Sequence, residues 1–266
     1  MGKRRFQPPL HLAIINDDFS AIGLLKHNPE QLLRKNWLGF SPVELANLLG
    51  KFEIADELHP AIHPPIAFQL EGQGEVAYCN RLQFEELFGV HYLPTLAFVS
   101  NDLLEKVVNN CPWLFKHTVI GQEHRSLGSS LRRQLYEGQT ANVAIKWIDE
   151  TMGYGLFAMQ AIPKEQFIGH YTGVVRKLRR FSPEINGYCM HLPTRFWSYD
   201  YFVIDAEKAG NELRFSNHSD EPNMRPFCVI DRDLVHICLF ACQDIEAGEE
   251  LTFDYGKDYW RKRTKK

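Results

Sequence analysis

Several features that would assign this chain to a specialised class are missing from its sequence. No apolar run reaches the roughly 20 residues that a membrane-spanning helix needs, and no apolar h-region follows the basic residues near the start. The six cysteines contain no CxxC pair and no dense framework, which favours free thiols in a reducing compartment over a disulfide-bonded secreted fold. We therefore expect a soluble protein with neither a membrane span nor a cleaved signal peptide.

Excess positive charge is missing as well. The 266 residues carry 30 Lys and Arg against 33 Asp and Glu, or −3 at pH 7, so the surface offers no overall basic field for a nucleic-acid backbone. We expect no direct sequence-specific binding of nucleic acid. The basic tail 261–266 is a local exception, and three interpretations of it stay open: a nuclear import patch, a contact with acidic nucleosome surfaces, or a solvated terminus.

What the sequence does contain is the composition of an ordinary globular protein, with 44% hydrophobic and 12% aromatic residues. Near its start, the segment Pro9 to Ala13 (PLHLA) recurs 33 residues later as Pro42 to Ala46 (PVELA). This period resembles the ankyrin pattern of a turn and two helices, and it predicts helices at 10–16, 20–26, 43–49 and 53–58. We assign residues 1–62 to ankyrin-like helical repeats; a plain pair of helical hairpins is the alternative.

Prolines at 60, 64 and 65 end this helical stretch, because proline removes a backbone donor and restricts the residue before it. Residues 63–140 form a mixed connecting region without recognisable chemistry. It contains predicted helices at 82–88, 102–108 and 128–136 and a segment at 95–99 that is either a strand or the approach to a helix. His11 is expected to hydrogen-bond local backbone, as in the first turn of an ankyrin repeat.

Short strand-like runs separated by glycine turns replace this pattern from residue 141 onward. Strands are predicted at 142–148, 155–159, 167–175, 201–205, 226–230, 234–241 and 250–253. The fold class is therefore α+β, with a helical first part and a mostly-β last part.

Three motifs in the strand-rich part carry the candidate chemistry. They are MGYGLFA at 152–158, GNELRFSNHSDEPN at 210–223 and GEELTFDYG at 248–256. Each motif alone also has an interpretation without catalytic chemistry. A GxG marks a tight turn, the NHS triplet satisfies a glycosylation sequon, and GEEL suits a turn that enters a strand.

In this order and spacing the three motifs resemble the SET domain family of protein lysine methyltransferases, over residues 141–260. The resemblance implies a compact arrangement of small sheets in which the C-terminal segment threads past the stretch with Asn217 and His218. Such threading is a rare exception to unknotted chain connections. It would place Asn217 and Tyr255 side by side.

The resemblance also implies a role for each matching residue. Tyr255, Tyr171 and Phe253 would face the methyl-transfer channel, with Phe253 setting how many methyl groups fit. The residues that would contact S-adenosylmethionine are Met152, Gly153, Tyr154, Gly155, Tyr188, Arg214, Phe215, Asn217, His218 and Trp260.

Methyl transfer needs few catalytic groups, which suits this set. A lysine with a pKa near ~10.4 must lose a proton at a cost of about 4 kcal/mol at neutral pH. An apolar aromatic channel and the facing sulfonium lower that pKa, while alignment of the reactants removes roughly 7–11 kcal/mol of the barrier.

The chain departs from the family pattern in several places. Many members bind zinc through a cysteine at the position of Asp220 and further cysteines after the last motif; this chain has neither, and no metal site is expected. His170 stands where a glutamate is common. Cys228, His236, Cys238 and Cys242 are interpreted as core residues because their spacing forms no short ligand pair. The aromatics at 195–199 either line the substrate channel or belong to the core.

These observations predict a protein lysine methyltransferase that uses S-adenosylmethionine and forms di- or trimethyllysine on a histone or another protein. The alternative is an inactive scaffold whose ankyrin-like part binds a partner. The expected location is the cytoplasm or nucleus, and a bacterial effector acting in a host cell is a further interpretation.

Overall fold

The structure is a computed structural model and describes residues 6–60, 64–178, 186–195 and 200–260. The helices are α1 (Pro9–Ile15), α2 (Phe19–Leu25), α3 (Pro29–Leu33), α4 (Pro42–Leu48), α5 (Phe52–Leu58), α6 (Arg81–Phe88), α7 (Asn101–Asn109), α8 (Trp113–His117), α9 (Ile120–Ser130), α10 (Arg132–Glu137), the 3-10 helix η1 (Glu212–Phe215) and α11 (Lys257–Trp260). None of the described helices combines the length and the hydrophobicity needed to cross a membrane.

Fifteen strands accompany these helices in the described parts of the chain. They are β1 (Ile66–Gln69), β2 (Ala77–Cys79), β3 (His91–Tyr92), β4 (Ala97–Phe98), β5 (Val143–Asp149), β6 (Gly153–Ala158), β7 (Phe167–His170), β8 (Val174–Leu178), β9 (Cys189–Leu192), β10 (Tyr201–Asp205), β11 (Ala209–Gly210), β12 (Asn217–His218), β13 (Met224–Asp231), β14 (Leu234–Ala241) and β15 (Thr252–Phe253).

The four helices predicted in the N-terminal part are confirmed as α1, α2, α4 and α5, each shifted by one residue at its start. Caps explain where they begin: Asp18 accepts from the Ala21 amide at α2, and Ser41 forms a capping box with Glu44 at α4. The short helix α3 was not predicted. Their identity as ankyrin repeats stays a prediction.

The prediction that His11 binds local backbone is wrong. Its fully buried ring contacts the Phe40 carbonyl oxygen through Nε2 at 2.8 Å, which is 29 residues away. Burial lowers the pKa of His11. The ring therefore connects the first helix pair to the loop before the second pair.

In the connecting region, α6 and α7 confirm two predicted helices, but the single helix predicted at 128–136 is wrong. The chain forms α9 and α10, which are separated at Leu131 (φ −93°, ψ 8°). Gly128 requires a close approach there, because a Cβ at this position would lie 1.9 Å from the Ile230 carbonyl oxygen. The helix pattern alone does not show that α9 lies against β13.

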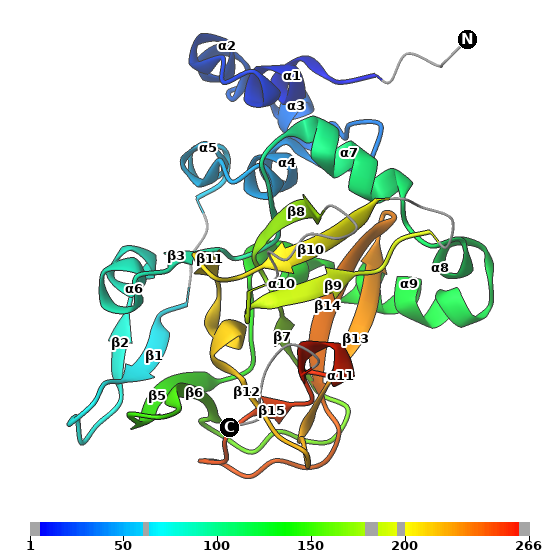
Figure 1. The fold of residues 1–266 in the computed structure, drawn as a ribbon. Coiled ribbons are helices and arrows are strands. Elements are labelled where there is room, and N and C mark those ends of the chain that lie inside the picture. Colours follow the sequence, from blue (N-terminus) through cyan, green and yellow to red (C-terminus); the bar gives the residue numbers. More distant parts are fainter. Residues whose placement is uncertain (1–5, 61–63, 179–185, 196–199, 261–266) are drawn as a thin grey trace.

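Strands of the connecting region complete three of the four sheets in the described structure. The sheet orders are β2-β1-β5-β6, β4-β8-β10-β9, β11-β3 and β12-β15-β13-β14-β7. The segment at 95–99 is thus resolved as a strand, β4, parallel to β8. Figure 1 shows the N-terminal helices at one end of the molecule and the small sheets below them.

The single strand predicted at 167–175 is also wrong, because β7 and β8 belong to different sheets. The chain turns between them at Tyr171–Gly173. At Gly173 a Cβ would lie 2.6 Å from the Asp205 carbonyl oxygen, so only glycine allows this approach. Strand β9 and helix α11 were not predicted from the sequence.

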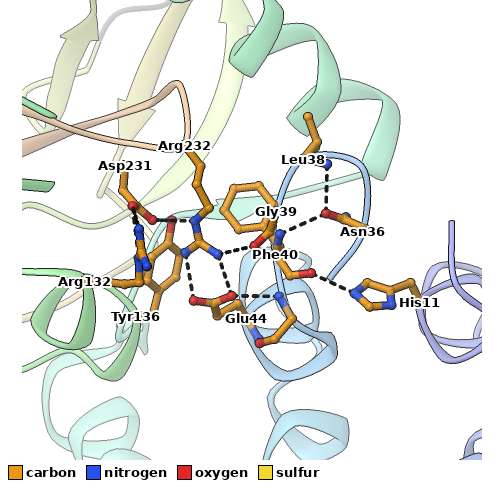
Figure 2. Close-up of polar contacts among 11 residues, drawn as sticks. His11, Asn36, Leu38, Gly39, Phe40, Glu44, Arg132, Tyr136, Asp231 and Arg232 are labelled. Atoms are coloured by element: carbon orange, nitrogen blue, oxygen red, sulfur yellow. Dashed lines mark hydrogen bonds and ion pairs between the residues drawn. The ribbon is translucent and has the colours of Figure 1, made fainter. Parts of the chain in front are cut away.

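The N-terminal helices are docked on the strand-rich part by Arg232, at the tip of the β13–β14 hairpin (Figure 2). Its guanidinium donates to both carboxylate oxygens of Glu44 at 2.7 and 2.8 Å, to the Gly39 carbonyl at 2.7 Å and to Asp231 at 2.6 Å. It also lies 4.5 Å from the centre of the Phe40 ring. Glu44 therefore caps α4 and binds the hairpin at the same time.

This contact continues into the hydrophobic core. Phe40, Leu45 and Leu48 are completely buried and belong to the same cluster as the core strands β13 and β14. A second, smaller cluster holds α1, α2 and α5 together. The N-terminal part thus joins the main core through α4 and the loop before it.

Candidate active site

The second and third motifs lie side by side because β12 and β15 pair in parallel. Asn217 is opposite Thr252, and His218 is opposite Phe253. The Tyr255 amide donates to His218 Nδ1 at 3.3 Å, and the two rings are 5.4 Å apart. The predicted neighbour of Tyr255 was Asn217, and in the structure the contacts of Tyr255 are with Ser216 and His218. The threading itself stays a prediction.

The first motif reaches this pair through Asn217. Its side-chain amide donates to the Tyr154 carbonyl at 3.3 Å and to Glu250 Oε1 at 2.8 Å. Asn217 therefore joins all three motifs. Gly153 has φ +73°, and a Cβ there would meet no atom within 4 Å, so the backbone borders open space. The side chain of Met152 is largely exposed beside it.

An aromatic wall supports the first two motifs from the connecting region. Tyr154 and Phe215 lie 6.2 Å apart, and Phe88 of α6 packs on both, at 5.3 and 5.2 Å. Trp147 covers the other side of Tyr154 at 5.1 Å. Two of the predicted cofactor residues are therefore held by α6, an element to which the sequence assigned no chemistry.

A cavity of about 720 Å³ opens next to this wall and contains all three predicted channel residues. Tyr171, Phe253 and Tyr255 line it together with Tyr188 and Arg214. The Arg214 guanidinium lies 4.2 Å from the centre of the Tyr188 ring. The structure thus brings five of the nominated residues to one space.

Both channel tyrosines donate their hydroxyl protons to main-chain carbonyls. Tyr171 donates to the Tyr188 carbonyl and Tyr255 to the Ser216 carbonyl, each at 2.8 Å. Burial raises the pKa of both phenols above the usual range. The hydroxyls therefore stay protonated at neutral pH, and the lone pairs of each oxygen are left as acceptors.

Helix α11 covers the third motif with aromatic rings. The ring of Trp260 lies 4.8 Å from that of His218 and stacks on Tyr255 at 6.5 Å, while Tyr259 contacts Tyr255 at 4.6 Å. The role of Trp260 at the cofactor stays a prediction. Tyr259 was not nominated, and its place two residues before a basic tail gave no signal of its role.

Sequence reasoning also missed Glu250, Ser216, Cys189 and Cys228. Glu250 lies inside the third motif but accepts from Asn217 only because β12 and β15 pair. Cys189 and Cys228 line the cavity, and burial raises the pKa of each thiol, that of Cys228 to about 11. The aromatics at 196–199 and the tail at 261–266 lie outside the described residues.

The cysteines are free thiols, and the described residues contain no group of three or more potential metal ligands. His236 meets His170, not a thiol: Nδ1 and Nε2 are 3.3 Å apart, and both rings are buried. Burial lowers the pKa of His236 to about 3 and that of His170 well below its usual value. Both rings are therefore neutral at physiological pH.

Comparison with protein families identifies the region that contains the three motifs. The family model of the SET domain matches residues 153–256. The histone-lysine N-methyltransferase SUV39H2 of Xenopus tropicalis is 34% identical over 131 residues, which cover 46% of this chain and 32% of the relative. The H3 lysine-36 specific histone-lysine N-methyltransferase of Schizosaccharomyces pombe is 32% identical over 147 residues, which cover 51% of this chain and 17% of the relative.

The matched part of this chain thus spans a third or less of the length of these relatives. Among solved structures, that of KRYPTONITE in complex with mCHH DNA, an H3(1-15) peptide and SAH is 33% identical, with a TM-score of 0.36, over 44% of this chain and 23% of the other.

Proposed function

We propose that this chain, whose residues 153–256 form a SET domain, is a protein lysine methyltransferase that uses S-adenosylmethionine. The observation that carries the proposal is the meeting of three distant motifs at one site. Asn217 binds the first and third motifs, and the cavity beside it contains Tyr171, Tyr255 and Phe253. The relatives that match this part of the chain are named histone-lysine N-methyltransferases.

The residues present fit S-adenosylmethionine. The positive φ of Gly153 and the open space at its missing Cβ leave room for a ligand against the main chain. The rings of His218 and Trp260 offer faces for a planar base. We assign these residues, with Met152, Tyr154, Gly155, Tyr188, Arg214, Phe215 and Asn217, to the cofactor site.

When bound, S-adenosylmethionine supplies an electrophilic methyl group and a positive sulfonium. Tyr171 and Tyr255 present oxygen lone pairs to the cavity, since each hydroxyl proton is already donated to a carbonyl. These oxygens would accept hydrogen bonds from a lysine amine and from the methyl group of the bound cofactor, which would align the two reactants. Neither phenol is a general base, because burial raises its pKa. The amine proton leaves to water before transfer.

The number of methyl groups transferred depends on Phe253 in this proposal. Phe253 is buried, and its ring lies 4.9 Å from that of Tyr255. A phenyl ring provides no hydroxyl to hold a water beside the amine, so a methylated amine has room to turn its lone pair toward the sulfonium. We assign di- or trimethyllysine as the product.

The substrate proposed is a lysine of a histone or another protein, and the proposed location is the nucleus or cytoplasm. An inactive scaffold, with a partner on the N-terminal helices, is the competing function. It is disfavoured because the two channel hydroxyls keep ordered acceptors and the cavity remains open.

Calorimetric titration with S-adenosylmethionine tests the proposal. The wild-type chain should bind, and Asn217→Ala should bind at least about tenfold more weakly, because the backbone of the first motif loses its hydrogen-bonded support. Ser219→Ala, in the same motif, is the matched control and should bind as the wild type does. A wild-type chain without heat of binding would favour the scaffold.

A further inference from the structure

The connecting region contributes a buried tyrosine to the loop that carries the second motif. The Tyr92 hydroxyl, on β3, donates to the Glu212 carboxylate. Its oxygen lies 3.1 Å from Oε2 and 3.4 Å from Oε1. Both side chains are 7% exposed, although they are 120 residues apart in the chain. Tyr92 lies outside the SET match at 153–256, and no role in the site has been given to either residue so far.

Backbone pairing fixes the two partners against each other. Strand β3 pairs in parallel with β11, where Tyr92 is opposite Gly210, and η1 begins at Glu212 two residues later. The Leu93 amide also donates to the Gly210 carbonyl at 3.0 Å. The hydroxyl–carboxylate contact therefore extends a short sheet onto the first turn of η1.

The buried carboxylate of Glu212 needs hydrogen-bond donors to offset the cost of removing it from water. Burial raises the pKa of the carboxyl, while the Tyr92 hydroxyl and the nearby Arg81 guanidinium oppose that rise. The Cys79 thiol of β2 also faces the carboxylate, and Asp56 faces Arg81 from the N-terminal helices. A buried carboxylate that loses a donor must move toward water or take up a proton.

A displacement of Glu212 would also displace residues that contact the methyl-transfer channel, because they follow it closely in the chain. Helix η1 continues into Phe215, which packs on Tyr154, and then into Ser216, whose carbonyl accepts the Tyr255 hydroxyl at 2.8 Å. Ser216, whose carbonyl orients the central tyrosine, is thus only four positions after Glu212 in the chain. A displacement of about 1 Å at such a group is enough to lower a rate on the order of 100-fold.

We propose that Tyr92 and Glu212 form a positioning pair through which the connecting region holds η1, and that the pair thereby orients Tyr255 for methyl transfer. This inference rests on the proposed methyltransferase function. It gives residues 80–92 a role in the reaction that does not require contact with substrate.

The chain contains a matched control for this pair. Tyr136 is another fully buried tyrosine, and it donates to the buried carboxylate of Asp231 at 3.1 Å, the same length as the Tyr92 contact. Asp231 lies at the hairpin that docks the N-terminal helices and is not among the residues that line the cavity. Tyr136→Phe therefore removes the same atom from the same kind of contact, without touching η1 or the Ser216 carbonyl that accepts the Tyr255 hydroxyl.

The test compares Tyr92→Phe, Tyr136→Phe and Tyr92→Phe/Glu212→Met for melting temperature, kcat and KM on a lysine peptide. Both single variants should lower the melting temperature. Only Tyr92→Phe should lower kcat, on the order of tenfold with KM nearly unchanged, and the double variant should recover most of kcat because no buried carboxylate is left without its donor. A kcat of Tyr92→Phe within twofold of wild type, or an equal loss in Tyr136→Phe, overturns the proposal.

Amide hydrogen exchange gives a readout that does not depend on turnover. Tyr92→Phe should speed exchange at residues 212–218, whereas Tyr136→Phe should leave that segment protected. If the wild type transfers no methyl group, the proposed function fails, and exchange still decides whether Tyr92 holds η1. Unchanged exchange at 212–218 in Tyr92→Phe refutes the positioning pair.

Discussion

Two regions contact residues 153–256, which match the SET domain model, through a buried hydroxyl–carboxylate hydrogen bond, and they differ in the element that this bond holds. Next to the N-terminal helices, Tyr136 of α10 and Arg232 hydrogen-bond to Asp231, and Arg232 also binds Glu44. At the connecting region, Tyr92 satisfies Glu212. The first contact packs next to the hydrophobic core that contains Phe40. The second contact holds the loop that orients Tyr255. A buried polar contact thus acquires its role from the element that it holds.

Among the variants considered, removal of residues 1–60 should lower the stability of the fold most. Phe40, Leu45 and Leu48 belong to the main core, so their loss exposes β13, β14 and the Arg232 side chain. We expect a truncated chain that is insoluble or melts far below the wild type, as a capping role predicts. A soluble truncation with wild-type melting temperature would show that the helices are an independent module.

Arg232→Met should have the next largest effect, because it leaves the Glu44 carboxylate without its cation and leaves Asp231 with Arg132 alone. Asp231 is 1% exposed and Glu44 is largely buried, and breaking such a buried ion pair costs about 3–5 kcal/mol. Arg225→Met removes the same charge from an exposed pair with Glu165 and should cost less than about 1 kcal/mol. Urea unfolding measures both. Equal losses in the two variants would contradict the anchoring role.

The paired rings of His170 and His236 lie between the two regions, since His236 packs on Tyr136 and His170 precedes Tyr171. Burial lowers the pKa of both, that of His236 to about 3, so the unfolded chain binds more protons as the pH falls below 6.5. Stability should therefore be greatest above pH 6.5, and His236 alone should remove about 2 kcal/mol by pH 5.

His236→Phe isolates this contribution, whatever its effect on absolute stability. The slope of unfolding free energy against pH between 5 and 6 should fall by about 1.4 kcal/mol per pH unit in the variant. Urea unfolding at a series of pH values provides the slopes. An unchanged slope would show that His236 is accessible to protons in the folded chain.

Phe253→Tyr should have the smallest effect on the fold and should act only on the product. The added hydroxyl retains a hydrogen-bonded water in the volume that a further methyl group needs. A time course of product masses under excess cofactor should show di- and trimethyllysine in the wild type and accumulation of monomethyllysine in the variant. A wild type that stops at monomethyllysine, or a variant with the same products, would remove the role given to Phe253.

The sequence predicted the parts of this molecule whose signals are local. The caps at Asp18 and Ser41 and the continuous apolar character of β14 depend on neighbouring residues, and those elements were found within a residue or two. The motifs around Asn217 and Tyr255 were readable because each combines several constrained positions in a short stretch. Tyr171 and Phe253 were found in the same way.

The missed features depend on contacts between distant segments. Nothing near Arg232 indicates that its partner is Glu44, 188 residues away, and Tyr92 meets Glu212 across 120 residues. The break at Leu131 follows from the packing of α9 on β13, which the helical pattern of 128–136 does not contain. Tertiary packing determines these contacts and this helix break, and such packing produces no periodic signal in the sequence.

The most direct test of the central claim is the transfer of a labelled methyl group from S-adenosylmethionine to lysine, measured by mass spectrometry for the wild type and Tyr255→Phe. The variant loses only the hydroxyl that donates to the Ser216 carbonyl, so fold and cofactor affinity should change little. The account predicts methyllysine with the wild type and a loss of about 100-fold or more in kcat with the variant. A variant that retains more than half of wild-type turnover would contradict the site described around Tyr255.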